Sequence, residues 1–337
     1  MASHIETPPF FDAIESRVAR HSSSGKVVYA ALLGNVLIAI TKFAAAAWTS
    51  SSAMLSEAVH SLVDTINELL LLYGMHRSRR PPDRAHPLGH GRELYFWSFV
   101  VAVMVFGLGA GVSLFEGVNH ILHPVPMENP TVNYVVLGIS FVFELGSWLV
   151  ALQAFRAAKG QRGYLEAIGV AKDPTTFTVL FEDSAALAGL LIAFAGIGAA
   201  QVFAMPKLDG IASLGIALVL AVAGAALARR TKQLLIGEQA SPELRCSILE
   251  IASRHAGIAK ANGVLTTQVG ADQVVAALSA EFDDRLTTPE IEDCVRTLEQ
   301  EIRSAHPEVS LLFVKPQTAA TWESKRKALG AAGTDSD

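Results

Sequence analysis

The stretch AVHSLVDTINELLLLYG, residues 58–74, combines the apolar pattern of a membrane-spanning helix with His60, Asp64, Asn67 and Glu68. His60 and Asp64 are four residues apart, so they lie on one helix face, and Asn67 and Glu68 continue that stripe. Ionisable side chains inside a membrane face the interior of a helix bundle or a water-filled path. The stretch therefore predicts a transmembrane helix whose polar face has a function.

The composition of the whole chain is that of a multi-pass membrane protein. Of its 337 residues, 51% are apolar and 18% are charged. The apolar residues gather in blocks long enough to cross a hydrocarbon core of roughly 30 Å. These blocks predict six spans, approximately at 28–49, 53–75, 94–117, 133–155, 177–201 and 208–229. The net charge of −5 is spread along the chain, which gives no reason to expect nucleic-acid binding.

Positive charge is distributed unevenly between the predicted loops. The loops 76–93 and 156–176 are rich in Arg and Lys, whereas 118–132 has neither and 200–208 has only Lys207. Because Lys and Arg accumulate in cytoplasmic loops, both termini and the basic loops should face the cytoplasm. We expect the membrane to be a bacterial inner membrane, with an organellar membrane as the alternative.

Beyond Arg230 the composition becomes that of a small soluble domain. Ser241 and Pro242 are typical of a helix start, and Thr288 followed by Pro289 predicts the cap of a second helix. Strand patterns surround these helices, which gives the order α-β-β-α-β and a two-layer α+β domain. The elements are expected at 241–257, at two strands within 263–282, at 288–306 and at 309–315.

The chain should therefore divide into four parts. These are a cytosolic N-terminal tail over 1–27, a transmembrane domain over 28–230, a cytosolic C-terminal domain over 231–317 and a disordered tail over 318–337.

The polar residues within the spans suggest a metal site. His60 and Asp64 could share one cation, but a tetrahedral site needs further ligands. The fifth predicted span offers them, since Glu182 and Asp183 lie near its midpoint. The alternative is a proton relay, or hydrogen bonds that hold the helices together.

A second candidate metal site lies in the loop between the second and third spans. Asp83, His86 and His90 have the spacing D-x-x-H-x-x-x-H, and Pro87 and the neighbouring glycines bend the chain. Imidazole and carboxylate ligands suit Zn²⁺ or a similar divalent ion. The alternative is a solvated basic loop with incidental histidines.

These motifs resemble those of the cation diffusion facilitator family. The resemblance rests on SSAMLSEAVHSLVDTINELLLLYG (51–74), PPDRAHPLGHGRELYFW (81–97) and LDGIASLGIALVLAVAGAALARRTKQLLIGE (208–238), and it covers about 28–317. It implies a homodimeric transporter, not an enzyme, that carries divalent cations, commonly Zn²⁺, in exchange for protons. It also implies six transmembrane helices and a metallochaperone-like C-terminal domain.

The resemblance assigns the transport ligands residue by residue. Two come from the second span, here His60 and Asp64, and Asp183 matches one of the two from the fifth span. The other is expected four residues earlier, where this chain has Val179, which cannot bind a metal. Glu182 is the nearest replacement, although a shift of one residue rotates it by about 100° around the helix. This variant looks like the branch that includes human zinc transporter nine.

The resemblance implies two further metal sites, and this sequence retains the residues of only one of them. The loop site matches Asp83, His86 and His90 without substitution. The site in the cytosolic domain needs histidines, but this chain has Asn262 at one position and VKPQ at 314–317. We therefore expect the cytosolic domain to dimerise without bridging zinc ions.

Two functions remain in competition. A proton-coupled transporter fits because metal binding requires a neutral imidazole and ionised carboxylates, so protons and metal compete for one site. A transport-inactive membrane scaffold or regulator is the alternative, suggested by Val179 and by the missing histidines of the cytosolic domain. The ligand types favour zinc, with iron, cobalt, cadmium or manganese as other candidates.

Overall fold

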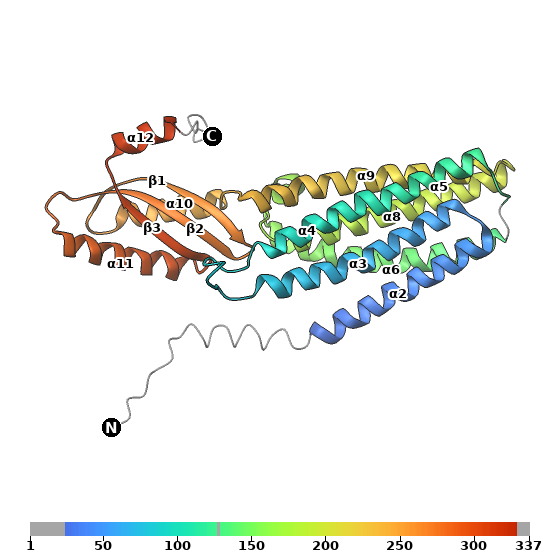
Figure 1. Cartoon of the computed structure of the whole chain (residues 1–337), viewed down its shortest axis with the longest axis horizontal. Coiled ribbons are helices and arrows are strands. Elements are labelled where there is room, and N and C mark those ends of the chain that lie inside the picture. The colour runs from blue at the N-terminus through green and yellow to red at the C-terminus, as the bar shows by residue number, and fades with distance from the viewer. Residues whose placement is uncertain (1–23, 127–128, 329–337) are drawn as a thin grey trace, which may run out of the picture. The chain divides into compact units, whose positions relative to one another are not determined.

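We describe the chain from a computed structural model, which defines residues 24–126 and 129–328. Long helices occupy all six positions at which the sequence predicts a span (Figure 1). They are α2 (Ser24–Thr49), α3 (Ser52–Ser78), α4 (Glu93–Met104) continuing through the π-helix η1 (Val105–Ala110) into α5 (Gly111–Leu122), α6 (Pro130–Lys159), α8 (Pro174–Val202) and α9 (Lys207–Ile236). A short helix, α7 (Tyr164–Val170), lies between α6 and α8 in the chain.

Four helical segments within the described residues are both long and apolar enough to cross a membrane. They are Glu93–Leu122, Pro130–Ala157, Phe177–Val202 and Lys207–Ile236. A shorter apolar helix, Asn35–Thr49, is part of α2. Helix α3 is long enough, but its polar stripe lowers its hydropathy. The chain is thus an integral membrane protein with a helical transmembrane domain.

Residue contacts divide the chain into two compact units. The first contains the chain up to Leu69 together with Val103–Val150 and Phe181–Ala225, and its core consists of small and branched apolar side chains from the long helices. Glycine allows close helix contact there: a Cβ on Gly117 of α5 would lie 2.9 Å from the carbonyl oxygen of Gly210 on α9. Close backbone approach at small residues is typical of helices packed in membranes.

The second unit contains Leu70–Ala102, Ala151–Leu180 and the chain from Ala226 onward. Its C-terminal part has the predicted order α-β-β-α-β (Figure 1). The elements are α10 (Pro242–Arg254), β1 (Ile258–Gly270), β2 (Gln273–Phe282), α11 (Thr288–Ala305) and β3 (Val309–Pro316), followed by α12 (Ala319–Ala328).

The three strands form one sheet in the order β1-β2-β3. β1 and β2 are an antiparallel hairpin around a turn at 271–272, whereas β3 pairs parallel to β2 because α11 carries the chain back across the sheet. Alternate residues of β2, such as Ala276 and Leu278, are fully buried in one core with Ile248 of α10 and Leu298 of α11. The domain is therefore two-layered, with both helices packed on one face of the sheet.

Two local predictions were wrong, and one cannot be assessed. Helix α11 is capped by Thr287 rather than Thr288, because the Glu290 carboxylate accepts hydrogen bonds of 2.7 Å from both the backbone N–H and the hydroxyl of Thr287. Residues 319–328, expected to be disordered, form α12, whose Trp322 covers Gly263 of β1. The predicted tails over 1–23 and 329–337 lie outside the described residues.

Candidate metal centres

Helix α3 positions the first two candidate ligands one above the other. The Nδ1 atom of His60 lies 3.4 Å from the Oδ1 atom of Asp64. His60 is 1% exposed. Neither ring nitrogen of His60, nor the Oδ1 atom of Asp64, has a hydrogen-bond partner among the described residues. Buried polar atoms are almost always satisfied, so this unpaired set is the kind that a bound cation would complete.

The two acids of α8 point to different helices. Glu182 is buried and accepts a hydrogen bond of 2.7 Å from the side-chain amide of Asn67 on α3. Asp183 accepts a hydrogen bond of 2.9 Å from the hydroxyl of Ser147 on α6. Adjacent residues on a helix are separated by about 100°, which explains why the two carboxylates diverge. Glu182 is therefore hydrogen-bonded to the α3 stripe, whereas Asp183 is hydrogen-bonded to α6.

The predicted transport ligands are near one another but are not gathered around one point. Asp64 interacts electrostatically with the carboxylates of Glu182, Asp183 and Glu144. Within the described part of the chain, however, the transport residues do not provide three ligand atoms within 4.8 Å of one another. Binding one metal through His60, Asp64, Asp183 and Glu182 would therefore require the side chains to reorient.

A buried ion pair lies one helical turn from His60. The ammonium group of Lys42 on α2 is 3.2 Å from the Oε2 atom of Glu57 and donates a 2.7 Å hydrogen bond to Ser61. Lys42 and Glu57 are completely buried. Gly189 of α8 leaves room for this pair, because a Cβ there would collide with the Glu57 carboxylate. The pairing of Lys42 with Glu57 was not predicted from the sequence, since nothing local links α2 to α3.

An acid that the sequence analysis did not consider joins α9 to α3. The Asp209 carboxylate accepts hydrogen bonds from the hydroxyl of Ser51 (2.9 Å) and from the backbone N–H of Ser52 (2.6 Å), so it caps the start of α3. His120 of α5 lies 3.9 Å from the same carboxylate. The sequence could have indicated a role for Asp209, because an acid stands there in the first turn of an apolar span. Its partners could not be identified in this way, because they are far away in sequence.

The loop residues Asp83, His86 and His90 come together. The two carboxylate oxygens of Asp83 lie 3.2 Å from His86 Nδ1 and 3.1 Å from His90 Nε2. One ligand atom from each residue lies within 4.8 Å of the other two. Gly89, with φ of 82°, makes the turn that returns the chain. These three residues are therefore arranged as a candidate site for a divalent metal.

Hydrogen bonds keep the Asp83 carboxylate ionised. The backbone N–H of His86, together with the side chains of His90 and His86, lowers the pKa of Asp83 to about 2. An ionised carboxylate is the form that binds metal. The neighbouring Gly91 lies against the hairpin of the C-terminal domain, where a Cβ would be 2.9 Å from the Cα atom of Gly270.

In the C-terminal domain, Asn262 stands at one position where the resemblance implies a histidine. The side-chain amide of Asn262 donates hydrogen bonds to the hydroxyl of Ser279 (3.2 Å) and to the backbone carbonyl of Gln317 (2.8 Å). The amide of Gln317 donates a 2.7 Å hydrogen bond to Ser279. This cluster consists of neutral groups that bond to one another.

Comparison with known proteins agrees with the fold and the motifs. The family model of the Cation efflux transmembrane domain matches residues 28–236 of this chain. The chain therefore belongs to the cation efflux family of membrane transporters, in agreement with the resemblance to cation diffusion facilitators.

Individual relatives support the same branch of the family. The mitochondrial proton-coupled zinc antiporter SLC30A9 from Homo sapiens is 34% identical over 267 residues, which are 78% of this chain and 47% of that protein. Metal tolerance protein C4 from Arabidopsis thaliana is 38% identical over 217 residues, 64% of this chain and 47% of the relative. The chain thus spans about half the length of these relatives. Cation-efflux pump FieF from Cronobacter sakazakii is 26% identical over 285 residues, 84% of this chain and 89% of the pump.

Proposed function

We propose that this chain exports divalent metal ions from the cytoplasm in exchange for protons, with Zn²⁺ as the main substrate. The single observation that carries the proposal is the pair formed by buried His60 and partly buried Asp64. The ring nitrogens of His60 and the Oδ1 atom of Asp64 have no hydrogen-bond partner among the described residues. Such ionisable groups in a span are costly and mark ion or proton pathways. The name of SLC30A9 describes a proton-coupled zinc antiporter, which supports the same substrate and coupling.

The proposed architecture has six spans. Helices α2 and α3 join the four strongly apolar segments, since both have the length to cross and α3 is polar only along the stripe. Both termini and the basic loops face the cytoplasm. The domain boundaries are those predicted from sequence, with the transmembrane domain over 28–230 and a dimerisation domain over 231–317. The chain functions as a homodimer.

The proposed transport site consists of His60, Asp64, Asp183 and Glu182. In the structure Glu182 hydrogen-bonds Asn67, and Asp183 hydrogen-bonds Ser147. We infer that metal binding breaks both hydrogen bonds and turns the two carboxylates toward His60 and Asp64. Glu182 would then supply the ligand that Val179 cannot.

Proton coupling follows from the chemistry of the ligands. His60 binds metal only when a ring nitrogen is unprotonated, and the carboxylates bind only when ionised. Metal therefore displaces protons on binding, and protons displace metal on release. Because both occupy one set of side chains, a proton gradient can drive metal in the opposite direction.

The loop residues Asp83, His86 and His90 have a different proposed role. They are preassembled, and Asp83 and His86 are exposed, so a metal can bind there without any span moving. A bound ion would hold the loop against the hairpin that Gly91 contacts. We propose that this metal modulates transport rather than passing through the protein.

A transport-inactive scaffold is the second candidate, because one family ligand is replaced by Val179 and the cytosolic histidines are absent. Zinc uptake into proteoliposomes distinguishes the two. If the chain is a transporter, the variant Asp64→Asn should abolish zinc uptake, because the transport site then loses a charged ligand. Glu116→Gln is the matched control, since Glu116 is another acid of a span and should leave uptake intact. Uptake by Asp64→Asn equal to that of the unmodified chain would contradict the proposal. Parallel assays with iron, cobalt, cadmium and manganese identify the preferred ion.

A further inference from the structure

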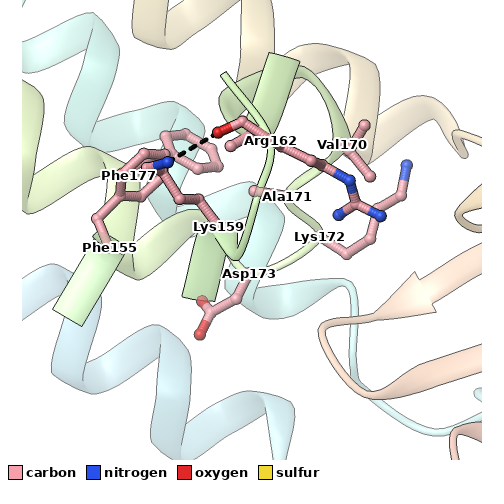
Figure 2. Close-up of a pocket in the computed structure, with 9 residues that line it drawn as sticks. Phe155, Lys159, Arg162, Val170, Ala171, Lys172, Asp173 and Phe177 are labelled. Atoms are coloured by element: carbon pink, nitrogen blue, oxygen red, sulfur yellow. Dashed lines mark hydrogen bonds between the residues drawn. The ribbon is translucent and has the colours of Figure 1, made fainter. Parts of the chain in front are cut away.

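A cavity of about 180 Å³ lies where α6 ends and α8 begins. Its apolar wall includes Phe155 of α6 and Phe177 of α8, both of them buried (Figure 2). Its polar wall consists of Lys159, Arg162 and Lys172. The cavity thus combines aromatic rings from two spans with three basic side chains, and it is separate from both candidate metal centres.

Lys159 is the basic residue that lacks an acidic partner. Its ammonium group donates a 2.8 Å hydrogen bond to the backbone carbonyl of Arg162 (Figure 2). It also donates a 3.3 Å hydrogen bond to the backbone carbonyl of Gly160, and it lies 5.0 Å from the centre of the Tyr164 ring. No carboxylate of the described residues forms an ion pair with it. The positive charge of Lys159 is therefore available to an anionic ligand.

The other two bases are held in place by acids of the C-terminal region. Arg162 forms an ion pair with Glu243, and Lys172 lies 3.0 Å from a carboxylate oxygen of Glu238. These pairs leave further donors on both side chains. The one acid of the cavity wall, Asp173, hydrogen-bonds Thr175 instead, and in Figure 2 its carboxylate points away from the basic side chains.

The side chains that line the cavity favour a ligand with a phosphate group attached to an apolar tail. Arg and Lys are the side chains that bind phosphate, through charge-assisted hydrogen bonds. The Phe155 and Phe177 rings provide apolar surface that a free phosphate ion would not use. Helix α6 also has the most exposed apolar surface: 11% of its apolar window is buried, against 39% in each of the other three strongly apolar segments. Lipid can therefore reach much of the apolar surface of α6.

We propose that this cavity binds the headgroup phosphate of an anionic phospholipid, with Lys159 as its main anchor. In the proposed topology the cavity lies on the cytoplasmic side, at the level of the headgroups, where basic pockets between transmembrane helices bind such lipids. The ligand would connect α6, α8 and the loop between them, next to the ion pairs that join this loop to Glu238 and Glu243.

The test is lipid binding by the purified full chain in neutral detergent, measured by microscale thermophoresis. The probes are short-chain phosphatidylglycerol, short-chain phosphatidylcholine and inorganic phosphate. Phosphatidylglycerol should bind saturably and more tightly than either of the other two. Lys159→Gln should weaken its binding about fivefold, the effect of losing one basic contact with an anionic lipid. Arg229→Gln is the matched control, because Arg229 is an exposed base at the end of α9 outside the cavity.

Three outcomes would overturn the proposal. The first is equal weakening by Lys159→Gln and Arg229→Gln, which would indicate a diffuse basic surface. The second is inorganic phosphate binding as tightly as phosphatidylglycerol with the same dependence on Lys159, which would exclude a lipid as the occupant. The third is a lack of saturable binding. Lys159→Arg retains the charge and should bind like the unmodified chain, which separates loss of the anchor from misfolding of Lys159→Gln.

Discussion

The side-chain amide of Asn67 donates a 2.7 Å hydrogen bond to the buried carboxylate of Glu182. Asn67 lies one helical turn after Asp64 on α3. The contact between Asn67 and Glu182 joins α3 to α8 at the level of the proposed transport site. It also distinguishes Glu182 from Asp183, which hydrogen-bonds Ser147 of α6. The acid that departs from the family spacing is thus the one that hydrogen-bonds the α3 stripe.

Glu182→Gln should reduce zinc affinity at least about tenfold, a loss typical of a residue that binds or supports a metal. The amide retains the size of the side chain and can still hydrogen-bond Asn67, so the fold should persist. Zinc affinity is measured by isothermal titration of the full chain in detergent, with Glu116→Gln as the control. Unchanged affinity would give Glu182 a purely structural role.

Lys42→Met should destabilise the protein by about 3 kcal/mol, because it leaves the buried carboxylate of Glu57 without its counter-ion. The double variant Lys42→Met/Glu57→Gln removes both charges and should recover most of the lost stability. The measurement is the midpoint of thermal unfolding in detergent. If the single variant were as stable as the double variant, the ion pair would have no role in stability.

Asp83→Asn should weaken zinc binding at the loop by a similar factor at every pH between 5 and 8. The pKa of Asp83 is depressed to about 2, so its charge is fully present above its ordinary pKa and is lost only as the pH falls toward 2. The Asp83 carboxylate therefore contributes the same negative charge to the site throughout this window. Zinc binding is measured at several pH values while uptake into proteoliposomes is followed in parallel. A change in the slope of affinity against pH, or complete loss of uptake, would contradict this account.

An imposed pH gradient, acidic inside the vesicles, should increase the initial rate of zinc uptake, since protons leaving the vesicle exchange for entering metal. His60→Asp keeps a ligand at this position but removes the imidazole. Because carboxyl groups titrate at lower pH than imidazoles, the pH response should shift toward acid, and softer ions should be disfavoured. The gradient is collapsed with a protonophore as a control. Uptake that is indifferent to the gradient would favour an uncoupled carrier or the scaffold.

The proposed homodimer should survive removal of metal by a chelator. Asn262, which stands where the resemblance implies a histidine, hydrogen-bonds Ser279 and the backbone carbonyl of Gln317, so dimer contacts in this domain should be apolar and hydrogen-bonded. Size-exclusion chromatography with light scattering on the full chain, with and without chelator, measures the effect. Dissociation into monomers would indicate a bridging metal site with other ligands.

The helices and strands could be predicted from sequence because their signals are local. Apolar blocks of sufficient length predict the positions of the long helices, and the period of the apolar pattern separates α10 and α11 from β1, β2 and β3. Errors arose at the ends of elements. Thr287 and Thr288 are both good caps, and the choice depends on which residue Glu290 can reach. Helix α12 is stabilised by Trp322 against β1, a contact that no local pattern indicates.

By itself, the sequence determined the residue types of both candidate metal centres and the face shared by His60 and Asp64, since helical spacing fixes which side chains are neighbours one turn apart. The candidate loop residues Asp83, His86 and His90 were identifiable because eight consecutive residues of the chain contain the whole set. Only the tertiary structure decided that Glu182 faces Asn67 while Asp183 faces Ser147, and that Lys42 neutralises Glu57. Each of these contacts joins two helices, and its geometry depends on how each helix is rotated about its axis, which is set by the packing of the entire bundle.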